Sequence, residues 1–231
     1  MSARLIDALV DFLLPQPCFL CGANSAGGPL CKACAVLLPE PGPYRCRRCA
    51  LPTFGTLTCG RCISRPPAFD ASVSAFEYRF PVSDMIRRLK YHGDIYLAKQ
   101  LGRMLVDVAS VGSVDVIVPM PLHRRRLGER GFNQALELAR PLARASGLPM
   151  LVDAVVRERD TSPQAGLSPA VRKRNLRGAF GCTRSFAGLS VLVVDDVMTT
   201  GATAEEFART LRSAGARRVE NLILARTLPG R

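Results

Sequence analysis

The stretch that decides the fold runs from Val191 to Thr203 and reads VLVVDDVMTTGAT. Its first four residues are all aliphatic, which is typical of a strand buried on both faces of a parallel sheet. Asp195 and Asp196 follow at the carboxyl end of this strand, and a turn of small and hydroxylated residues leads into the next helix. Free backbone N–H groups and the helix dipole favour an anion at such a helix start. The stretch therefore predicts a phosphate site with two carboxylates beside it.

The residue types of this stretch also indicate the kind of ligand. Gly201 lets the backbone approach an anion closely, and the threonine hydroxyls add hydrogen-bond donors. Carboxylates cannot bind phosphate, but they accept hydrogen bonds from hydroxyl groups of the same ligand. A five-carbon sugar phosphate with vicinal hydroxyls satisfies both halves. The alternative, an ordinary helix start capped by threonine, does not require paired acids, a glycine and three threonines together.

The rest of the chain from Asp70 onward alternates between strand and helix patterns. Alternating or β-branched apolar runs predict strands at 72–79, 114–121, 190–196 and 218–227. Apolar residues at helical spacing predict helices at 82–92, with Ser83 as its cap, and at 97–109, 132–147 and 201–215. Strands that alternate with helices predict an α/β fold with a parallel sheet and right-handed crossovers. Ligands of such sheets bind beyond the carboxyl ends of the strands.

Eight of the nine cysteines form four C-x-x-C pairs, arranged as two copies of C-x2-C-x9-C-x2-C. Two thiolates on one tight knuckle can reach the same ion, and two knuckles complete a tetrahedron. Structural zinc contributes on the order of 10 kcal/mol or more in such small modules. We expect two structural zinc ions, paired sequentially, while the spacing leaves an interleaved pairing open. The expected ligands are Cys18, Cys21, Cys31 and Cys34, and Cys46, Cys49, Cys59 and Cys62.

A disulfide framework is the alternative for these cysteines, and it requires an oxidising compartment. The N-terminal residues read as a short amphipathic helix and not as a signal peptide, because Asp7 and Asp11 interrupt the apolar run and no small-residue cleavage site follows. No uninterrupted apolar stretch is long enough to span a bilayer. We therefore expect a cytoplasmic protein without membrane insertion, and a lone Cys182 that packs as a small apolar residue.

The change in composition along the chain suggests two domains, and the net charge suggests anionic partners. Residues 1–66 are expected to hold the N-terminal helix and the double zinc ribbon, and residues 67–231 the α/β domain. The net charge of +13, from 32 basic and 19 acidic side chains, favours nucleotides, phosphorylated sugars or nucleic acid. The charge does not choose among these partners.

The stretch 191–203 resembles the phosphoribosyl pyrophosphate (PRPP) motif of type I phosphoribosyltransferases, in which an aliphatic strand, two acids and a T-T-G-x-T/S loop follow one another. The resemblance implies a type I phosphoribosyltransferase-like parallel sheet flanked by helices. It also implies that the loop holds the 5′-phosphate and that Asp195 and Asp196, as catalytic residues, hold the ribose hydroxyls. The loop positions carried over are Val197, Met198, Thr199, Thr200, Gly201, Ala202 and Thr203.

Three further stretches, RRLKYHGD (87–94), VPMPLHRRRLGERGFNQA (118–135) and RDTSPQAGLSPAVRKRNLRGAF (159–180), together with the cysteine ribbons, resemble the ComF family. This family includes ComFC and GntX-type proteins and is tied to natural competence and the use of imported DNA. The resemblance spans nearly the whole chain, from about Cys18 to Thr227. It implies that the loop after the strand at 114–121 holds pyrophosphate. The further PRPP-binding candidates are Lys90 in the first of these stretches and Pro119, Met120, Pro121, Leu122 and Arg130 in the second. It also implies a flexible loop that closes over the substrate, with Gln164, Arg172, Arg174 and Asn175 as candidates.

Two functions follow from this resemblance taken together with the positive charge, the basic clusters RRRLGERG and RKRNLR, and the zinc ribbons, which suit the backbone of a single strand. In the first, the protein binds PRPP with Mg²⁺, acts in DNA uptake or the use of imported DNA, and handles single-stranded DNA with competence or helicase proteins as partners. In the second, it is a PRPP-dependent phosphoribosyltransferase whose acceptor the sequence does not specify. Aromatic residues make up only 6% of the chain and tryptophan is absent, so stacking platforms for bases are scarce. Tyr91 and Phe132 are the best placed candidates for stacking.

Overall fold

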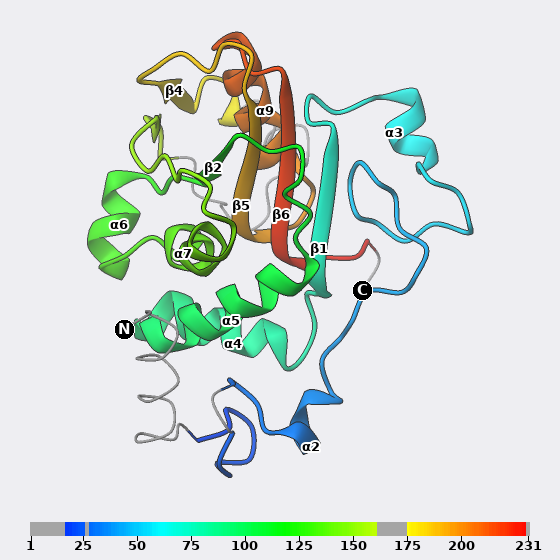
Figure 1. The fold of residues 1–231 in the computed structure, drawn as a ribbon, viewed down its shortest axis with the longest axis vertical. Helices are drawn as coiled ribbons and strands as arrows, with labels where there is room; N and C mark the ends of the chain where they lie inside the picture. Colours follow the sequence, from blue (N-terminus) through cyan, green and yellow to red (C-terminus); the bar gives the residue numbers. More distant parts are fainter. Residues whose placement is uncertain (1–16, 26–27, 161–174, 230–231) are drawn as a thin grey trace.

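The computed structural model describes residues 17–25, 28–160 and 175–229 (Figure 1). The predicted N-terminal helix lies outside these residues. So do the flexible-loop candidates Gln164, Arg172 and Arg174.

The centre of the fold is a four-stranded parallel sheet with the order β1-β6-β5-β2 (Figure 1). Every neighbouring pair is parallel, as the alternation of strand and helix patterns predicts. The strands are β1 (Ala71–Glu77), β2 (Val116–Pro119), β5 (Ser190–Met198) and β6 (Arg218–Arg226). Strand β5 lies between β2 and β6, so the stretch that carries the paired acids occupies an interior position.

Helices cover both faces of the sheet. On one face lie α4 (Val82–His92), α5 (Ile95–Val108) and α7 (Gln134–Ser146), and on the other lies α9 (Ala202–Ser213) (Figure 1). Beside α9 lies a small antiparallel sheet of β3 (Val155–Arg157) and β4 (Phe180–Cys182). A short helix, α6 (Arg124–Arg130), follows β2. The predictions named neither α6 nor the small sheet.

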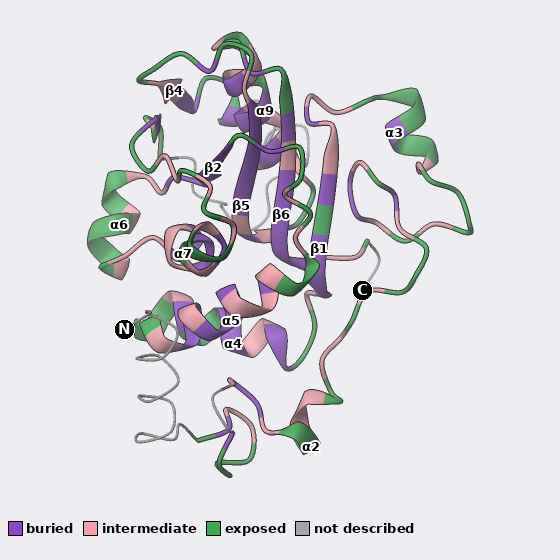
Figure 2. Ribbon diagram, viewed as in Figure 1, coloured by how far each residue is buried: buried purple, intermediate pink, exposed green. Residues whose placement is uncertain are grey.

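Strand β5 is apolar without a break because both of its faces are buried. Leu192 and Val194 belong to the core beneath α4, α5 and α7, whereas Val191 and Val193 belong to the core beneath α9. Figure 2 shows β5 and β6 buried along most of their length. Side chains alternate along a strand, so the four aliphatic residues supply both layers of the core.

Two local predictions need correction. Strand β5 does not end at the acids but continues through them to Met198, because β6 runs alongside it as far as Arg226. Helix α4 begins at Val82 after Pro81, so Ser83 lies inside the first turn. Its hydroxyl donates to Asp84 Oδ1 at 3.1 Å and does not cap the helix.

The two cysteine units pack against different parts of the α/β domain. The first, which contains α2 (Lys32–Ala35), contributes Cys18 and Leu30 to the core beneath α4. The second, which contains α3 (Gly60–Ser64), lies along β1 (Figure 1). There the Ser72 N–H donates to the Arg47 carbonyl at 2.8 Å. The Glu77 N–H donates at 2.8 Å to the carbonyl of Pro39, which lies in the segment between the two units. The second unit therefore covers the outer edge of the sheet, while the domain boundary near residue 66 stays a prediction.

Among the residues that the structure describes, no helix combines the length and the apolar character needed to cross a bilayer.

Candidate functional site

The eight paired cysteines form two clusters, and each cluster contains one complete C-x2-C-x9-C-x2-C unit. In each cluster the four sulfur atoms lie within 4.8 Å of one another. The Sγ atoms of Cys21 and Cys31 are 3.7 Å apart, as are those of Cys49 and Cys59. Zn–S bonds of about 2.3 Å place tetrahedral sulfur ligands about 3.8 Å apart, whereas a disulfide requires about 2.05 Å.

These clusters therefore fit two structural zinc ions, and the sequential pairing is confirmed over the interleaved one. Four thiolates leave no open position for a substrate, which is the arrangement of a structural site. Zinc would tie the two knuckles of each unit together, since these segments contain only short helices and little apolar core.

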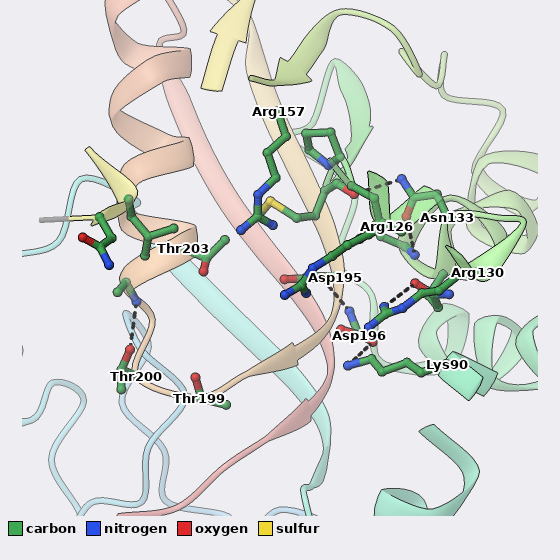
Figure 3. Close-up of a pocket in the computed structure, with 18 residues that line it drawn as sticks. Lys90, Arg126, Arg130, Asn133, Arg157, Asp195, Asp196, Thr199, Thr200 and Thr203 are labelled. Atoms are coloured by element: carbon green, nitrogen blue, oxygen red, sulfur yellow. Dashed lines mark hydrogen bonds and ion pairs between the residues drawn. The ribbon is translucent and has the colours of Figure 1, made fainter. Parts of the chain in front are cut away.

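A pocket of about 200 Å³ opens at the carboxyl ends of β2 and β5 (Figure 3). Twelve of the predicted site residues line it: Lys90, Met120, Pro121, Leu122, Arg130, Asn175, Asp195, Asp196, Thr199, Thr200, Ala202 and Thr203. Pro119, Val197, Met198 and Gly201 are next to lining residues in the chain. The structure thus brings together four parts of the chain that are far apart in the sequence, and the binding roles of their residues stay predictions.

The turn between β5 and α9 forms one wall of the pocket. Thr199 and Thr200 are exposed, and Ala202 and Thr203 begin the helix. Gly201 has φ +83°, a left-handed conformation that disfavours any other residue. The Thr200 hydroxyl accepts a hydrogen bond from the Ala202 N–H at 3.3 Å. This geometry leaves the amide end of α9 facing the pocket, which suits a phosphate group.

The paired acids form the floor of the pocket. They are adjacent in β5, so their side chains leave the strand on opposite faces. Asp196 turns toward α4, where its Oδ2 lies 2.6 Å from Lys90 Nζ. The Asp195 carboxylate accepts from the Asp196 N–H at 2.9 Å. Burial, followed by the charge of Asp196, raises the pKa of Asp195 to about 7, although Lys90 and Arg157 act in the opposite direction.

Basic side chains form the opposite wall. Lys90 comes from α4, Arg126 and Arg130 come from α6, and Arg157 comes from β3 (Figure 3). The Arg130 guanidinium donates to Gln134 Oε1 at 3.0 Å and lies 5.9 Å from the centre of the Tyr91 ring. A second cavity of about 570 Å³ shares Lys90, Arg126 and Arg130 with the pocket, so the basic surface continues outward past Tyr91.

The residue that sequence reasoning missed most clearly is Arg157. Its guanidinium lies 5.5 Å from the centre of the Phe180 ring, and burial lowers its pKa. It reaches the pocket because the three-residue strands β3 and β4 place it there. The chain around it carries no motif, and only the apolar pair Val155 and Val156 before it is typical of a strand. Asn133, which also lines the pocket, donates to the Met120 carbonyl at 3.0 Å and so fixes the loop after β2.

Comparison with known proteins gives a consistent result. Residues 9–63 match the double zinc ribbon domain, and residues 131–229 match the phosphoribosyl transferase domain. The DNA utilization protein YhgH of Escherichia coli K12 is 36% identical over 225 residues, which cover 93% of this chain and 99% of that protein. Competence protein F of Haemophilus influenzae is 32% identical, over 90% of this chain and 96% of that protein. Competence protein ComFC of Bacillus subtilis is 28% identical, over 80% of this chain and 79% of that protein.

The similarity extends over nearly the full length of the first two relatives. The first matched domain contains both cysteine clusters, and the second contains β5 with the paired acids and the turn that follows them. The chain therefore belongs to the ComF family, in which a double zinc ribbon precedes a phosphoribosyltransferase domain.

Proposed function

We propose that the pocket binds PRPP. The observation that carries this proposal is the meeting, in one cavity, of an anion-binding helix start, two carboxylates and a basic wall. The 5′-phosphate would lie on the turn from Thr199 to Thr203, and the ribose hydroxyls would donate to Asp195 and Asp196. The pyrophosphate would lie against the loop after β2 and against Arg130. Each part of the ligand then meets the chemical group that suits it.

Mg²⁺ accompanies this ligand in the proposal. The ion usually keeps several waters and binds through one or two carboxylates together with substrate phosphates. Asp195 and Asp196 supply such carboxylates beside the expected sugar, and the remaining oxygen ligands would come from PRPP and water. When bound, the ion neutralises charge on the pyrophosphate. Lys90, Arg126 and Arg130 contribute to the same neutralisation from the protein side.

The biological setting that we propose is DNA uptake or the use of imported DNA. The relatives carry the names of DNA utilization and competence proteins, and the similarity covers both domains. The proposal includes a cytoplasmic location and competence or helicase proteins as partners. Transfer of the phosphoribosyl group to an acceptor is the alternative, and it would make the chain a phosphoribosyltransferase whose acceptor is unidentified.

A panel of ligands measured by thermal unfolding tests the proposed site. PRPP with Mg²⁺ is expected to raise Tm more than ribose 5-phosphate or pyrophosphate does, because only PRPP reaches the turn, the acids and the basic wall together. At a hundred times the dissociation constant the added stability is about 2.7 kcal/mol. Ribose 5-phosphate and pyrophosphate are the controls for the two ends of the ligand. A shift with pyrophosphate alone that equals the shift with PRPP would contradict a role for the phosphate turn and the acids.

Single-stranded DNA is a second candidate ligand because the basic surface continues beyond the pocket. Arg125, Arg126 and Arg130 line the second cavity, with Tyr91 beside them. Glu129 and Asp160 lie in the same cavity, and Asp160 is 3.7 Å from Arg125. The net charge of these residues together with Lys90 is still positive, and an aromatic ring beside arginines suits a nucleic acid strand.

The salt dependence of binding tests this second function. Replacing Arg125, Arg126 and Arg130 by glutamine is expected to weaken binding of a single-stranded oligonucleotide. It should also reduce the slope of log K against log salt by about 2, since each phosphate contact contributes about 0.7. Arg144→Gln, at the exposed far end of α7, is the matched control and should leave the slope unchanged. A wild-type affinity that does not change with salt would reject backbone binding by this surface.

A further inference from the structure

The most deeply buried cation of the described chain lies outside the pocket. Arg226 is the last residue of β6 and is only 1% exposed. Its side chain is the largest of the fully buried side chains among the described residues. Within the described ranges, no carboxylate lies at ion-pair distance from it. A buried charge is costly unless hydrogen bonds and an opposite charge compensate it. The hydrogen bonds of Arg226 therefore indicate which segments this residue stabilises.

The guanidinium of Arg226 binds backbone carbonyls from three parts of the chain. Its Nε donates to the carbonyl of Cys49, a zinc ligand of the second unit, at 2.8 Å. Its Nη1 donates to the carbonyls of Met198 at 2.7 Å, of Thr199, and of Thr227 at 2.8 Å. Thr199 is the first residue of the turn from Thr199 to Thr203, here called the phosphate turn, and Met198 directly precedes it. One side chain therefore joins that turn to the second zinc unit.

Zinc bound at the second cluster would also supply the missing opposite charge. Four thiolates around one Zn²⁺ carry a net charge of −2, and Cys49 is one of those ligands. A guanidinium keeps its charge at neutral pH even when it is buried. Figure 1 shows the end of β6 close to the loops of this unit. Loss of zinc would free the knuckle and leave the guanidinium without this fixed counter-charge.

The backbone of the knuckle is held in a conformation that fits this role. Ala50, which follows Cys49, has φ +58° and is the one non-glycine residue of the described chain in the left-handed region. The Ala50 N–H donates to the Cys46 carbonyl at 2.8 Å, which closes the turn. Such strain persists only where surrounding contacts fix it, and it often accompanies function. Here the turn presents the Cys49 carbonyl to Arg226.

We propose that Arg226 is a positioning residue through which the second zinc site supports the phosphate turn, so that zinc at Cys46, Cys49, Cys59 and Cys62 sets the affinity for the 5′-phosphate end of the ligand. The effect on affinity rests on the proposed binding of PRPP. The support of the turn itself does not, and it can be measured without any ligand.

The experiment compares the loss of each zinc ion separately. Cys59→Ser/Cys62→Ser removes ligands of the second site, and Cys31→Ser/Cys34→Ser is the matched control at the first. Zinc content is expected to fall from two to one per chain in both. Hydrogen exchange is expected to accelerate at least tenfold in the first variant only, at residues 195–203 and at Thr227. The Thr227 N–H reports on the turn because it donates to the Met198 carbonyl. Unchanged exchange after loss of the second zinc would overturn the proposal.

Arg226→Lys provides a second, independent variant. Lysine keeps the charge, but a single nitrogen cannot bind carbonyls of three segments in the planar geometry of a guanidinium. It is expected to accelerate exchange of the same residues with two zinc ions still bound. If it fails to fold, the cysteine variants still decide the question.

Ligand binding separates positioning from general destabilisation. In Cys59→Ser/Cys62→Ser and in Arg226→Lys, the affinity for ribose 5-phosphate is expected to fall about tenfold, while the affinity for pyrophosphate stays within twofold. An equal loss of both affinities would contradict a role confined to the phosphate turn. If wild type binds neither compound, the proposed function fails, and the exchange measurement alone decides whether Arg226 couples zinc to the turn.

Discussion

Replacing Asp195 and Asp196 together by asparagine is expected to lower the affinity for PRPP by at least about 100-fold. A hydrogen bond to a charged group contributes about 1.5–3 kcal/mol, so losing two of them costs about 3 kcal/mol or more, which corresponds to about 100-fold. The variant also loses the carboxylates that would accompany Mg²⁺. Calorimetric titration with PRPP and Mg²⁺ measures the change. Asp107→Asn, an exposed acid on α5, is the control and should bind as wild type does.

The pH dependence of stability shows whether the replacement of Asp195 preserves the fold. The pKa of Asp195 is raised to about 7 in the folded chain, from an ordinary value of 3.8. The native state therefore binds this proton more tightly than the unfolded state, and the protonated carboxyl contributes stability that is lost as the pH rises from about 4 through about 7. Asp195→Asn removes this loss. It is expected to unfold at a higher temperature than wild type at pH 8, and at a similar temperature at pH 4.

These two results together distinguish a binding residue from a structural one. If Asp195→Asn is more stable than wild type at pH 8 and the double variant no longer binds PRPP, the replacements have removed the site and kept the fold. Wild-type affinity in the double variant would show that the carboxylates do not hold the ribose. Lower stability of the double variant at pH 8 would show that the pair supports the strand through the contact of Asp196 with Lys90.

Removal of zinc is expected to have the largest effect on stability. Binding free energies of structural zinc reach about 10–16 kcal/mol in small modules, and each cluster here joins knuckles that have little other structure. Elemental analysis should give about two zinc ions per chain, and treatment with a strong chelator should lower Tm and unfold both units. Loss of the second unit would also expose the edge of β1, which predicts aggregation.

The ninth cysteine provides the control for this experiment. Cys182 packs against the core beneath α9, and its Sγ lies 3.8 Å from the Thr210 carbonyl, away from both clusters. Cys182→Ser should keep two zinc ions and nearly the same response to chelator. A soluble, folded protein that contains no zinc would contradict the assignment of the clusters.

The sequence predicted those parts of the molecule whose physical cause lies in consecutive residues. The aliphatic run, the paired acids and the glycine of 191–203 are adjacent in the chain, and the structure places them on β5, at the pocket and at a left-handed turn as expected. The cysteine spacing predicted two zinc sites but left the pairing open, because pairing depends on distances in space. Ser83 was wrong as a cap, because the helix begins at Val82 and Pro81 occupies the cap position.

Residues whose role depends on distant partners could not be predicted. Arg157 reaches the pocket only because β3 pairs with β4 across the segment between them. Arg226 reads as an ordinary surface charge at the end of a strand, and its role appears only when the Cys49 and Met198 carbonyls are seen on either side of it. Neither environment leaves a local pattern in the sequence.

A crystal structure of the chain with PRPP and Mg²⁺ tests the proposed site most directly. It should show the 5′-phosphate on the backbone amides between Thr199 and Thr203, the ribose hydroxyls within hydrogen-bond distance of Asp195 and Asp196, and the pyrophosphate against Arg130. A complex in which the sugar phosphate lies elsewhere, or in which the two carboxylates do not contact the ribose, would contradict the proposal.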